Sequence, residues 1–559
     1  MRISLARSKI RWRVIALAIA ALTVAGAATV VARTTTAEAA APAPIGVEDE
    51  GASCPVSLPG SLTSNAKLPD PFKKLDGTRI STQSEWTCRR EEIEQLAEKY
   101  VYGTKPAKPA SVTGTVSRTG ITVNVSDNGR SASFSASVSL PSGTGPFPAV
   151  VVFAGLGADT STIQGAGVAV INYNPLSVGA EGTPRTNKQG AFYTLYGSSS
   201  STGLLMAWAW GVSRIIDVIQ QSGGSILKAD ALGVTGCSRY GKGAFVTGAF
   251  DERIALTMPI ESGSGGAPIF RGIPGESGSQ PLSSAYSEQP WLGDAFSSFT
   301  GNPNTLPVDT HEMVAMVAPR GLFMMENPHI DWLAAKSGSV AALGGAEVYK
   351  ALGAGDNISY WSDIQDGTHC AVRPEWKTPL QQNLQKFLLR TGNAAGVIRV
   401  SSLKSGNLAD WRDWTTPTLT GGTPTSAPPT SAPPTSAPPT SAPPTSAPPT
   451  SAPPTSAPPT SAPPTSAPPA SCTASMVAGT VWGDRYNTAV NVTGSSNWVV
   501  TVTITAPQKI SSTWNISASW DSSGNVMTAR PNGNGNSFGF TTMFNGNTGA
   551  RPRVSCRVG

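Results

Sequence analysis

The chain has 559 residues, too many for one ordinary domain, and 58 of them are Gly and 47 are Pro. Charged residues make up only 14% of the chain, and the net charge is +6. Because the basic residues are scattered outside an N-terminal group, no nucleic-acid-binding stripe is expected. The six cysteines, an even number, are compatible with three disulfides in an exported protein.

The N-terminus has the three parts of a secretion signal. Residues 1–13 carry five Arg or Lys, residues 14–32 are almost wholly apolar, and Ala-Glu-Ala at 37–39 offers a cleavage site. A membrane anchor is the alternative, but Ala, Gly and Thr make the apolar stretch only weakly hydrophobic. We therefore predict a signal peptide over residues 1–39, a loose segment over 40–53, and a secreted, extracellular protein without a stable membrane anchor.

Residues 54–415 have the pattern of one large α/β domain. Alternating sequences at 112–125 and 131–138 predict antiparallel strands. Continuous apolar runs predict strands buried on both faces, at 148–155, 167–172, 231–235, 254–260, 321–325 and 358–364. Helices are predicted over 204–221, which has an apolar stripe with helical spacing, and over 243–250. Strands that alternate with helices indicate a doubly wound, mostly parallel sheet.

The composition changes abruptly near residue 416. Residues 426–470 repeat Ser-Ala-Pro-Pro-Thr nine times, with Ala in place of the last Thr. This repeat has no core-forming residue, so we predict an extended, polyproline-II-like linker over residues 416–471. Residues 472–559 are rich in Trp, Asn, Thr, Ser and Gly, and their alternating runs predict a small all-β sandwich. A bridge between Cys472 and Cys556 would tie its first strand to its last.

One motif stands between a predicted buried strand and a predicted helix: Gly-Cys-Ser-Arg-Tyr-Gly-Lys at 236–242. A serine flanked by glycines at such a turn is typical of the nucleophile elbow of α/β-hydrolases, where the tight turn exposes the hydroxyl. The spacing Gly-x-Ser-x-x-Gly is one residue longer than the usual pattern, and a plain Gly/Ser-rich loop is the alternative. Ser238 is the candidate nucleophile.

A serine nucleophile needs a base, and the chain has three histidines, His311, His329 and His369. His369 follows the last predicted strand, which gives the α/β-hydrolase chain order of Ser, acid, His. We interpret the other two histidines as structural. No group of His, Cys and carboxylate residues has the spacing of a metal site, so we expect no metal and no other cofactor.

The cysteines support this choice of base. Cys237 precedes the candidate nucleophile and Cys370 follows the candidate base. A disulfide between them would hold the nucleophile beside its base, and two unrelated buried thiols are the alternative. Cys54 would then pair with Cys88.

Two carboxylates are candidates for the acid that orients the histidine. Glu261 follows the strand after the nucleophile helix, and Glu326 follows the next core strand, closer to the usual acid position. Either could orient the imidazole and stabilise its cation. Spacing alone does not decide between them.

Several motifs occur in order over most of residues 54–390. They are Gly-Cys-Ser-Arg-x-Gly-Lys, Glu-Ser-Gly-Ser-Gly-Gly (261–266), Leu-Pro-Val-Asp (306–309), Ala-Pro-Arg-Gly (318–321), Glu-Asn-Pro-x-x-Asp-Trp-Leu (326–333) and His-Cys (369–370). The series resembles the glucuronoyl esterases, carbohydrate esterase family 15. The resemblance implies an α/β-hydrolase fold in which Ser238, Glu261 and His369 form the triad. It also implies that Arg239 stabilises the oxyanion through its backbone N–H and guanidinium.

The same resemblance implies a set of residues that hold the uronate sugar. They are Lys242, Gln280, Glu288 and Trp332. Lys242 and Trp332 lie inside the motifs, whereas Gln280 and Glu288 lie in a poorly patterned stretch. Solvated surface groups, and a core aromatic in the case of Trp332, are the alternatives.

The C-terminal region resembles carbohydrate-binding modules of family 2, which bind crystalline cellulose or xylan. The resemblance is carried by its two cysteines, Val-Trp-Gly (481–483), Trp498, Ser-Thr-Trp-Asn (512–515) and Ser-Phe-Gly-Phe (537–540). It implies a flat row of exposed aromatic residues that stack on sugar rings. Tyr486 and Trp514 match two members of the row, and Trp520 is the candidate substitute for a third that is missing near residues 529–533.

The expected protein is a secreted, monomeric serine esterase that carries a cellulose-targeting module. Its implied substrate is the ester between 4-O-methyl-glucuronic acid side chains of glucuronoxylan and lignin alcohols, with specificity on the acid side. The alternatives are another polysaccharide esterase on the same fold, such as an acetylxylan or feruloyl esterase, and a wall-binding protein without activity.

Overall fold

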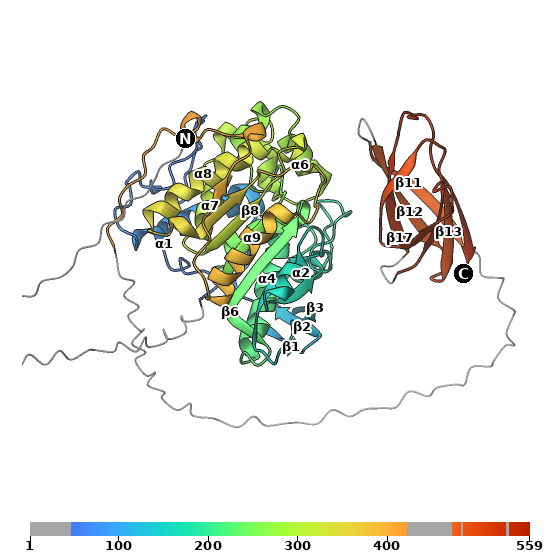
Figure 1. Cartoon of the computed structure of the whole chain (residues 1–559), viewed down its shortest axis with the longest axis horizontal. Helices are drawn as coiled ribbons and strands as arrows, with labels where there is room; N and C mark the ends of the chain where they lie inside the picture. Colours follow the sequence, from blue (N-terminus) through green and yellow to red (C-terminus); the bar gives the residue numbers. More distant parts are fainter. Residues whose placement is uncertain (1–45, 422–471, 482–484, 533–535) are drawn as a thin grey trace, which may run out of the picture. The chain divides into compact units, whose positions relative to one another are not determined.

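The computed structural model describes residues 46–421, 472–481, 485–532 and 536–559, and the chain forms two compact units. The predicted signal peptide and the Pro-rich repeat lie outside the described residues. The first unit contains the predicted α/β domain and the second contains the predicted β-sandwich (Figure 1).

The first unit is built on a ten-stranded sheet with the order β1-β2-β3-β5-β4-β6-β7-β8-β9-β10. The strands are β1 Ser111–Val116, β2 Gly120–Asp127, β3 Arg130–Ser139, β4 Phe147–Phe153, β5 Ala169–Tyr173, β6 Leu227–Cys237, β7 Ile254–Ile260, β8 Gly321–Met325, β9 Ile358–Trp361 and β10 Ile398–Arg399. Strands β1 to β3 are antiparallel to their neighbours, and the strands from β5 to β10 run parallel. The predicted mostly parallel sheet is confirmed.

Helices cover both faces of this sheet (Figure 1). They are α1 Glu85–Ala97, α2 Thr160–Gly165, α3 Ala191–Tyr196, α4 Leu204–Gln221, α5 Arg239–Phe250, α6 Leu282–Glu288, α7 Thr310–Val317, α8 Ala335–Ala351 and α9 Pro374–Asn383. Along β4, Val151 and Phe153 belong to the large core under α4, α5, α7 and α8. Val150 and Val152 belong to the smaller core under α2 and α9. The continuous apolar run of β4 therefore reflects burial on both sides, as in a doubly wound sheet.

After β10 the chain returns across the first unit. The Trp414 ring packs edge-on against Phe72 with 5.9 Å between ring centroids, and Leu419 is buried. Thr420 forms an isolated parallel bridge with Thr82, just before α1. The predicted start of the linker, residue 416, therefore lies within a tail that still packs on the first unit.

The second unit consists of two four-stranded sheets, with orders β11-β12-β17-β14 and β15-β16-β13-β18. Its strands are β11 Thr473–Val481, β12 Arg485–Thr493, β13 Trp498–Thr503, β14 Lys509–Trp514, β15 Ser517–Trp520, β16 Val526–Arg530, β17 Ser537–Met543 and β18 Arg553–Val558. One core lies between the sheets, where fully buried Trp498 stacks on Phe538. Cys472 and Cys556 form the predicted disulfide. The β-sandwich prediction is confirmed.

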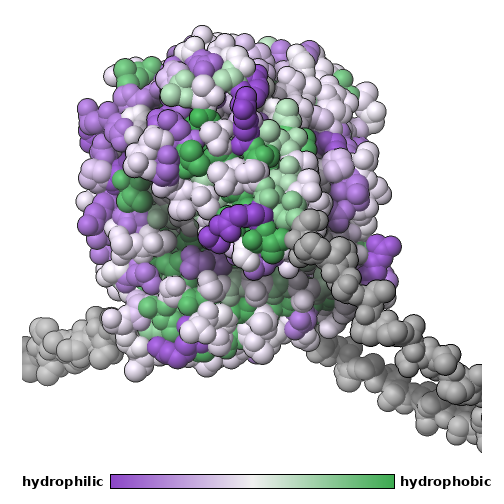
Figure 2. Space-filling view, turned by 90° about the vertical axis from the view of Figure 1, so that its right-hand side faces the viewer, coloured by the Kyte–Doolittle hydropathy of each residue, from purple (hydrophilic) through white to green (hydrophobic). Residues whose placement is uncertain are grey.

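The face drawn in Figure 2 carries several hydrophobic patches interrupted by strongly hydrophilic side chains. Within the described part of the chain, no helix combines the length and the apolar character that crossing a membrane requires.

Candidate active site

Ser238 lies at the junction of β6 and α5 with φ 61° and ψ −127°. A positive φ is uncommon for a residue other than Gly and is typical of a strained functional turn. Its backbone N–H donates to the carbonyl of Ile260 at 2.9 Å, which holds the turn against the end of β7. A Cβ at Gly241 would lie 2.4 Å from that same carbonyl oxygen. Residue 241 is thus the position where the turn has no room for a side chain against β7. This explains why the second glycine of the motif stands at 241, one residue later than usual.

The predicted disulfide between Cys237 and Cys370 is confirmed, with 5.8 Å between the Cα atoms. The loop after β4 lies directly on it. A Cβ at Gly157, where φ is +71°, would be 2.6 Å from the Cβ of Cys237 and 3.2 Å from that of Cys370. The bridge therefore connects the end of β6 with the His369 loop and supports the loop after β4. The predicted Cys54–Cys88 disulfide is also present.

Glu261 is the carboxylate that contacts the candidate base. Its Oε2 lies 2.6 Å from Nδ1 of His369 and accepts a hydrogen bond from the backbone N–H of Cys370 at 2.8 Å. Its Oε1 accepts from Asn327 Nδ2 and Arg373 Nη2, each at 3.3 Å. A fully buried carboxylate with four donors is fixed in place. It favours the imidazole tautomer with the proton on Nδ1, which leaves Nε2 to accept a proton.

Glu326 is fully buried one strand further along the sheet, at the end of β8. Its Oε1 is 3.4 Å from the Ser262 hydroxyl, and its Oε2 has no hydrogen-bond partner in the described part of the chain. Burial, and then the charge of Glu261, raise the pKa of Glu326 to about 8. The side chain is therefore mostly protonated at neutral pH, and the geometry favours Glu261 for orienting the histidine.

The four predicted sugar-binding residues form a connected series beside His369. Trp332 approaches the His369 ring edge-on, with 5.0 Å between centroids, and its carbonyl accepts from the backbone N–H of Gln280 at 3.2 Å. Gln280 Nε2 donates to Glu288 Oε2 at 2.8 Å. Glu288 in turn acts electrostatically on Lys242. Residues distant in sequence thus lie around one site.

Lys242 is buried behind the nucleophile turn, and its ammonium donates to the carbonyl of Ser262. Burial lowers the pKa of Lys242 to about 8, and the carboxylate of Glu288 opposes that shift. The ammonium also lies 5.4 Å from the centroid of the Trp291 ring. The alternative interpretation of Lys242 as a solvated surface group is therefore wrong.

Sequence reasoning missed four residues of this site: Asn327, Arg373, Glu181 and Trp291. Glu181 Oε2 lies 2.8 Å from Arg239 Nη1, and its Oε1 accepts from Trp291 Nε1 at 2.6 Å. Nothing in the Gly- and Thr-rich stretch around Glu181 indicated this partnership. Asn327 stands inside a recognised motif and Arg373 only three residues after Cys370, so these two could have been suspected.

The arrangement has the parts that acyl transfer needs. Ser238 lies on the tight turn between β6 and α5, and α5 begins at Arg239. His369 pairs with Glu261, and its loop is joined to the end of β6 by the Cys237–Cys370 disulfide. The first N–H groups of a helix have no intrahelical acceptor and attract negative charge. Glu261, His369 and the two cysteine sulfurs lie within 4.8 Å of one another. Both sulfurs are in the disulfide, however, and a metal ligand would have to be a thiolate.

The aromatic residues proposed for sugar stacking in the second unit differ in exposure. The side chains of Trp514 and Trp520 are exposed, at 38% and 47%. A Cβ at Gly539 would be 2.2 Å from the Trp514 ring, so the indole lies against the β17 backbone. Tyr486 is only 2% exposed, and its hydroxyl donates to Gln508 Oε1 at 3.2 Å. The prediction that Tyr486 belongs to an exposed row is therefore wrong, because its ring is buried against Phe544, with 5.1 Å between ring centroids.

Comparison with known proteins identifies the family. A family model described as "Glucuronyl esterase, fungi" matches residues 123–353. The 4-O-methyl-glucuronoyl methylesterase of Hypocrea jecorina is 40% identical over 377 residues, which cover 66% of this chain and 80% of that protein. The enzyme of the same name from Thermothelomyces thermophilus is 39% identical, over 66% of this chain and 92% of its own length. The chain belongs to the glucuronoyl esterase family. It is accordingly a carboxylic ester hydrolase.

Solved structures of glucuronoyl esterases share the fold of the first unit. The Hypocrea jecorina catalytic domain matches with a TM-score of 0.61 at 38% identity, and covers 65% of this chain and 100% of its own. A mutant of the Sporotrichum thermophile enzyme, solved in complex with methyl 4-O-methyl-beta-D-glucopyranuronate, matches with a TM-score of 0.61 at 37% identity, over 66% of this chain and 100% of its own. The predicted α/β-hydrolase fold is confirmed.

Proposed function

We propose that this chain is a secreted enzyme that hydrolyses the ester between 4-O-methyl-glucuronic acid side chains of glucuronoxylan and lignin alcohols. The observation that carries the proposal is the contact of His369 with Glu261, together with the disulfide between Cys237 and Cys370, the neighbours in sequence of Ser238 and His369. The names of the relatives, and the uronate ester bound by the Sporotrichum thermophile mutant, support the acid side of the substrate.

Ser238 attacks the uronate carbonyl carbon while Nε2 of His369 accepts the hydroxyl proton. Glu261 keeps Nδ1–H of the histidine in place and stabilises the imidazolium. The developing oxyanion lies at the start of α5, where the backbone N–H and guanidinium of Arg239 are its donors. His369 then protonates the departing alcohol, and an acyl-enzyme remains on Ser238.

Water completes the reaction by the same path. His369 removes a proton from the water molecule, the resulting tetrahedral intermediate collapses, and Ser238 recovers its proton as the uronic acid leaves. Lys242, Gln280, Glu288 and Trp332 hold the sugar. These residues form hydrogen bonds with the sugar hydroxyls. An analogue that lacks one hydroxyl would leave a buried polar group of the enzyme without a partner, so the enzyme discriminates strongly between acids.

The second unit is proposed to bind cellulose or xylan through Trp514 and Trp520. Their exposed rings offer the apolar faces on which sugar rings stack. Secretion is supported by the cysteines, since all six form disulfides, which persist in oxidising compartments.

The test is alcohol release from benzyl glucuronate and methyl glucuronate, with an acetyl ester and a feruloyl ester as controls. Parent and Ser238→Ala are assayed together. Turnover of the glucuronate esters alone, abolished in the variant, supports the proposal. Turnover of only the acetyl or feruloyl ester would overturn the assigned substrate, and a fully active Ser238→Ala would overturn the assigned nucleophile.

A further inference from the structure

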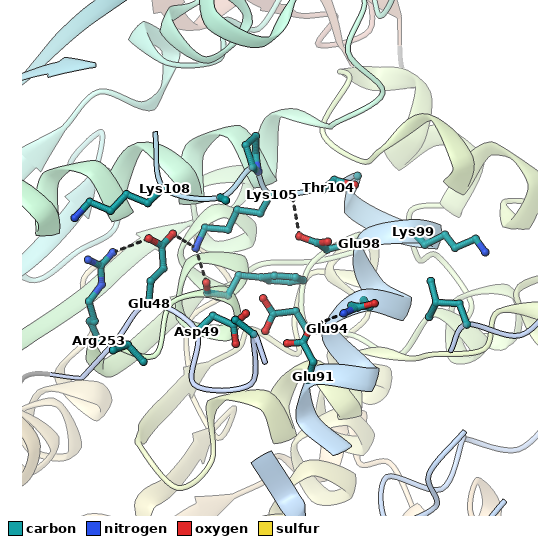
Figure 3. Close-up of a pocket in the computed structure, with 18 of the residues that line it drawn as sticks. Glu48, Asp49, Glu91, Glu94, Glu98, Lys99, Thr104, Lys105, Lys108 and Arg253 are labelled. Carbon is teal, nitrogen blue, oxygen red and sulfur yellow. Dashed lines mark hydrogen bonds and ion pairs between the residues drawn. The ribbon is translucent and has the colours of Figure 1, made fainter. Parts of the chain in front are cut away.

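A cavity of about 1100 Å³ lies between the segment at residues 46–58 and helix α1, away from every residue proposed for the esterase site. Its wall is strongly charged (Figure 3). Glu91 and Glu94 reach it from α1, where a spacing of three residues places them on one helix face. Asp49 reaches it from the segment before Cys54.

The carboxylates of Asp49, Glu91 and Glu94 converge on one point of this wall (Figure 3). One oxygen from each of the three lies within 4.8 Å of the others. Glu91 and Glu94 are only 5% and 6% exposed. Three negative groups this close, two of them buried, repel one another unless a proton or a cation lies between them.

The neighbouring groups leave part of this charge uncompensated. Arg90 Nη1 pairs with Glu94 Oε2 at 2.9 Å. Gln95 donates to Glu91 Oε1 at 2.6 Å, but Glu91 Oε2 is buried without a hydrogen-bond donor among the residues that the structure describes. The carboxylate of Asp49 acts on Glu91 more strongly than the cation of Arg90 does, and it is of the same charge.

Three lysines of the described chain line this wall, and one of them, Lys105, serves another carboxylate, because its Nζ pairs with Glu48 at 2.6 Å. Among the residues that the structure describes, six carboxyl groups line the cavity, against the four cationic side chains of Lys99, Lys105, Lys108 and Arg253. The wall therefore carries more carboxyl groups than cations.

We propose that Asp49, Glu91 and Glu94 form a calcium site whose remaining ligands are waters in the cavity. Ca²⁺ binds carboxylate oxygens at about 2.3–2.6 Å, so oxygens on opposite sides of the ion stand about 4.6–5.2 Å apart, as this cluster allows. Mg²⁺ requires about 2.1 Å and near-octahedral geometry. The all-oxygen ligand set lacks the His and thiolate ligands that select zinc. The ion would fasten the segment that carries Cys54 to α1.

The test uses the full secreted protein, freed of metal with EDTA and dialysed, then titrated with CaCl₂ by calorimetry and by thermal unfolding. We expect one Ca²⁺ per chain with a Kd on the order of 10⁻⁴–10⁻³ M, the range of extracellular calcium modules. The unfolding temperature rises with calcium, because the ion binds only the folded chain. Activity on a soluble glucuronate ester is the same in EDTA and in calcium.

Glu91→Gln distinguishes a metal ligand from a packing residue. The amide keeps the shape of the side chain, removes one charge and supplies a donor to Asp49. In EDTA this variant is expected to unfold at the same or a higher temperature than the parent, whereas in calcium it binds at least ~10-fold more weakly. Asp49→Asn, on the outer segment, is expected to lose binding in the same way. Asp413→Asn changes the charge equally at an exposed position and keeps the parent's calcium response.

Three results would overturn the proposal. One is a parent protein that neither binds calcium nor gains thermal stability at about 10 mM CaCl₂, above the range of such sites. Another is undiminished binding in both Glu91→Gln and Asp49→Asn, which would put the ion elsewhere. The third is equal binding and stabilisation by MgCl₂, which contradicts a site of calcium dimensions.

Discussion

Glu261 Oε2 lies 2.6 Å from His369 Nδ1, and the same oxygen accepts the backbone N–H of Cys370, the next residue in the chain. One carboxylate oxygen thus fixes both the imidazole and the peptide that follows it. A displacement of the loop that carries His369 would stretch both contacts together. Orientation of the base is therefore built into the backbone of its loop as well as into its side chain.

Glu261→Gln should lower kcat by about 10³–10⁴-fold, because an amide cannot stabilise the imidazolium and can impose the wrong tautomer. Glu326→Gln is the matched control. With a pKa raised to about 8, Glu326 already carries its proton at pH 7, and Gln imitates that form. Steady-state kinetics on benzyl glucuronate at pH 7 measure both variants. Equal losses in the two would contradict the assignment of Glu261.

The activity should fall as the pH rises through about 8, where Lys242 loses its proton. Burial lowers the pKa of this lysine, so its cation is present below about 8 and is lost above it. Because the cation takes part in holding the sugar, KM should rise on the alkaline side. The measurement is kcat and KM from pH 6 to 10, corrected for uncatalysed hydrolysis, with pH limits chosen about two units either side of this value.

Two variants isolate that alkaline effect. Lys242→Met should have a raised KM at neutral pH and no further increase above pH 8 that depends on this group. Lys228→Met removes an exposed lysine of β6 and should follow the parent profile. A descending limb that persists unchanged in Lys242→Met would assign it to a different group.

Removal of the Cys237–Cys370 bridge should reduce kcat by about 100-fold, because displacements near 1 Å between reacting groups cost about that much. The double variant Cys237→Ala/Cys370→Ala tests this on a soluble ester. Cys54→Ala/Cys88→Ala removes the other disulfide of the same unit and should lower thermal stability while kcat changes little. The opposite ranking of the two kcat values would show that the bridge beside Ser238 has no positioning role.

Trp514→Ala should weaken retention on insoluble cellulose at least ~10-fold, since a truncated central aromatic commonly costs more than 1 kcal/mol of binding. The kcat/KM on soluble esters should not change. Tyr486→Phe keeps the buried ring and should bind like the parent. Depletion assays on cellulose and on insoluble xylan measure both. Binding that survives in Trp514→Ala but is lost in Tyr486→Phe would reject the surface proposed here.

The sequence predicted helix and strand boundaries best for elements that are buried on both sides. The helix predicted over 204–221 and the strands over 254–260 and 321–325 match α4, β7 and β8 end for end. The run at 358–364 ends as a strand at Trp361, because apolar character alone does not show where sheet pairing stops. The ends of these strands position the motif residues, which follow them directly in the chain.

Side-chain partnerships between distant segments were beyond the sequence. The pairing of Glu181 with Arg239 joins residues 58 apart, and no local pattern marks it. The acidic cluster of Asp49, Glu91 and Glu94 has no metal-site spacing, since a fold brings its members together. The exposure of Tyr486 was wrongly predicted for a related reason. Alternation along β12 shows which residues share a face of the strand, but it does not show which face is turned toward the opposite sheet.

The tail of the first unit also determines how the domain would respond to mechanical load. A pull on the chain beyond residue 421 is borne first by the bridge of Thr420 to Thr82 and by the buried side chains of Leu419 and Trp414. None of these contacts includes a residue proposed for the esterase site. Tension from a module anchored to a solid surface would therefore peel the tail before it strained the strands that present Ser238 and Glu261.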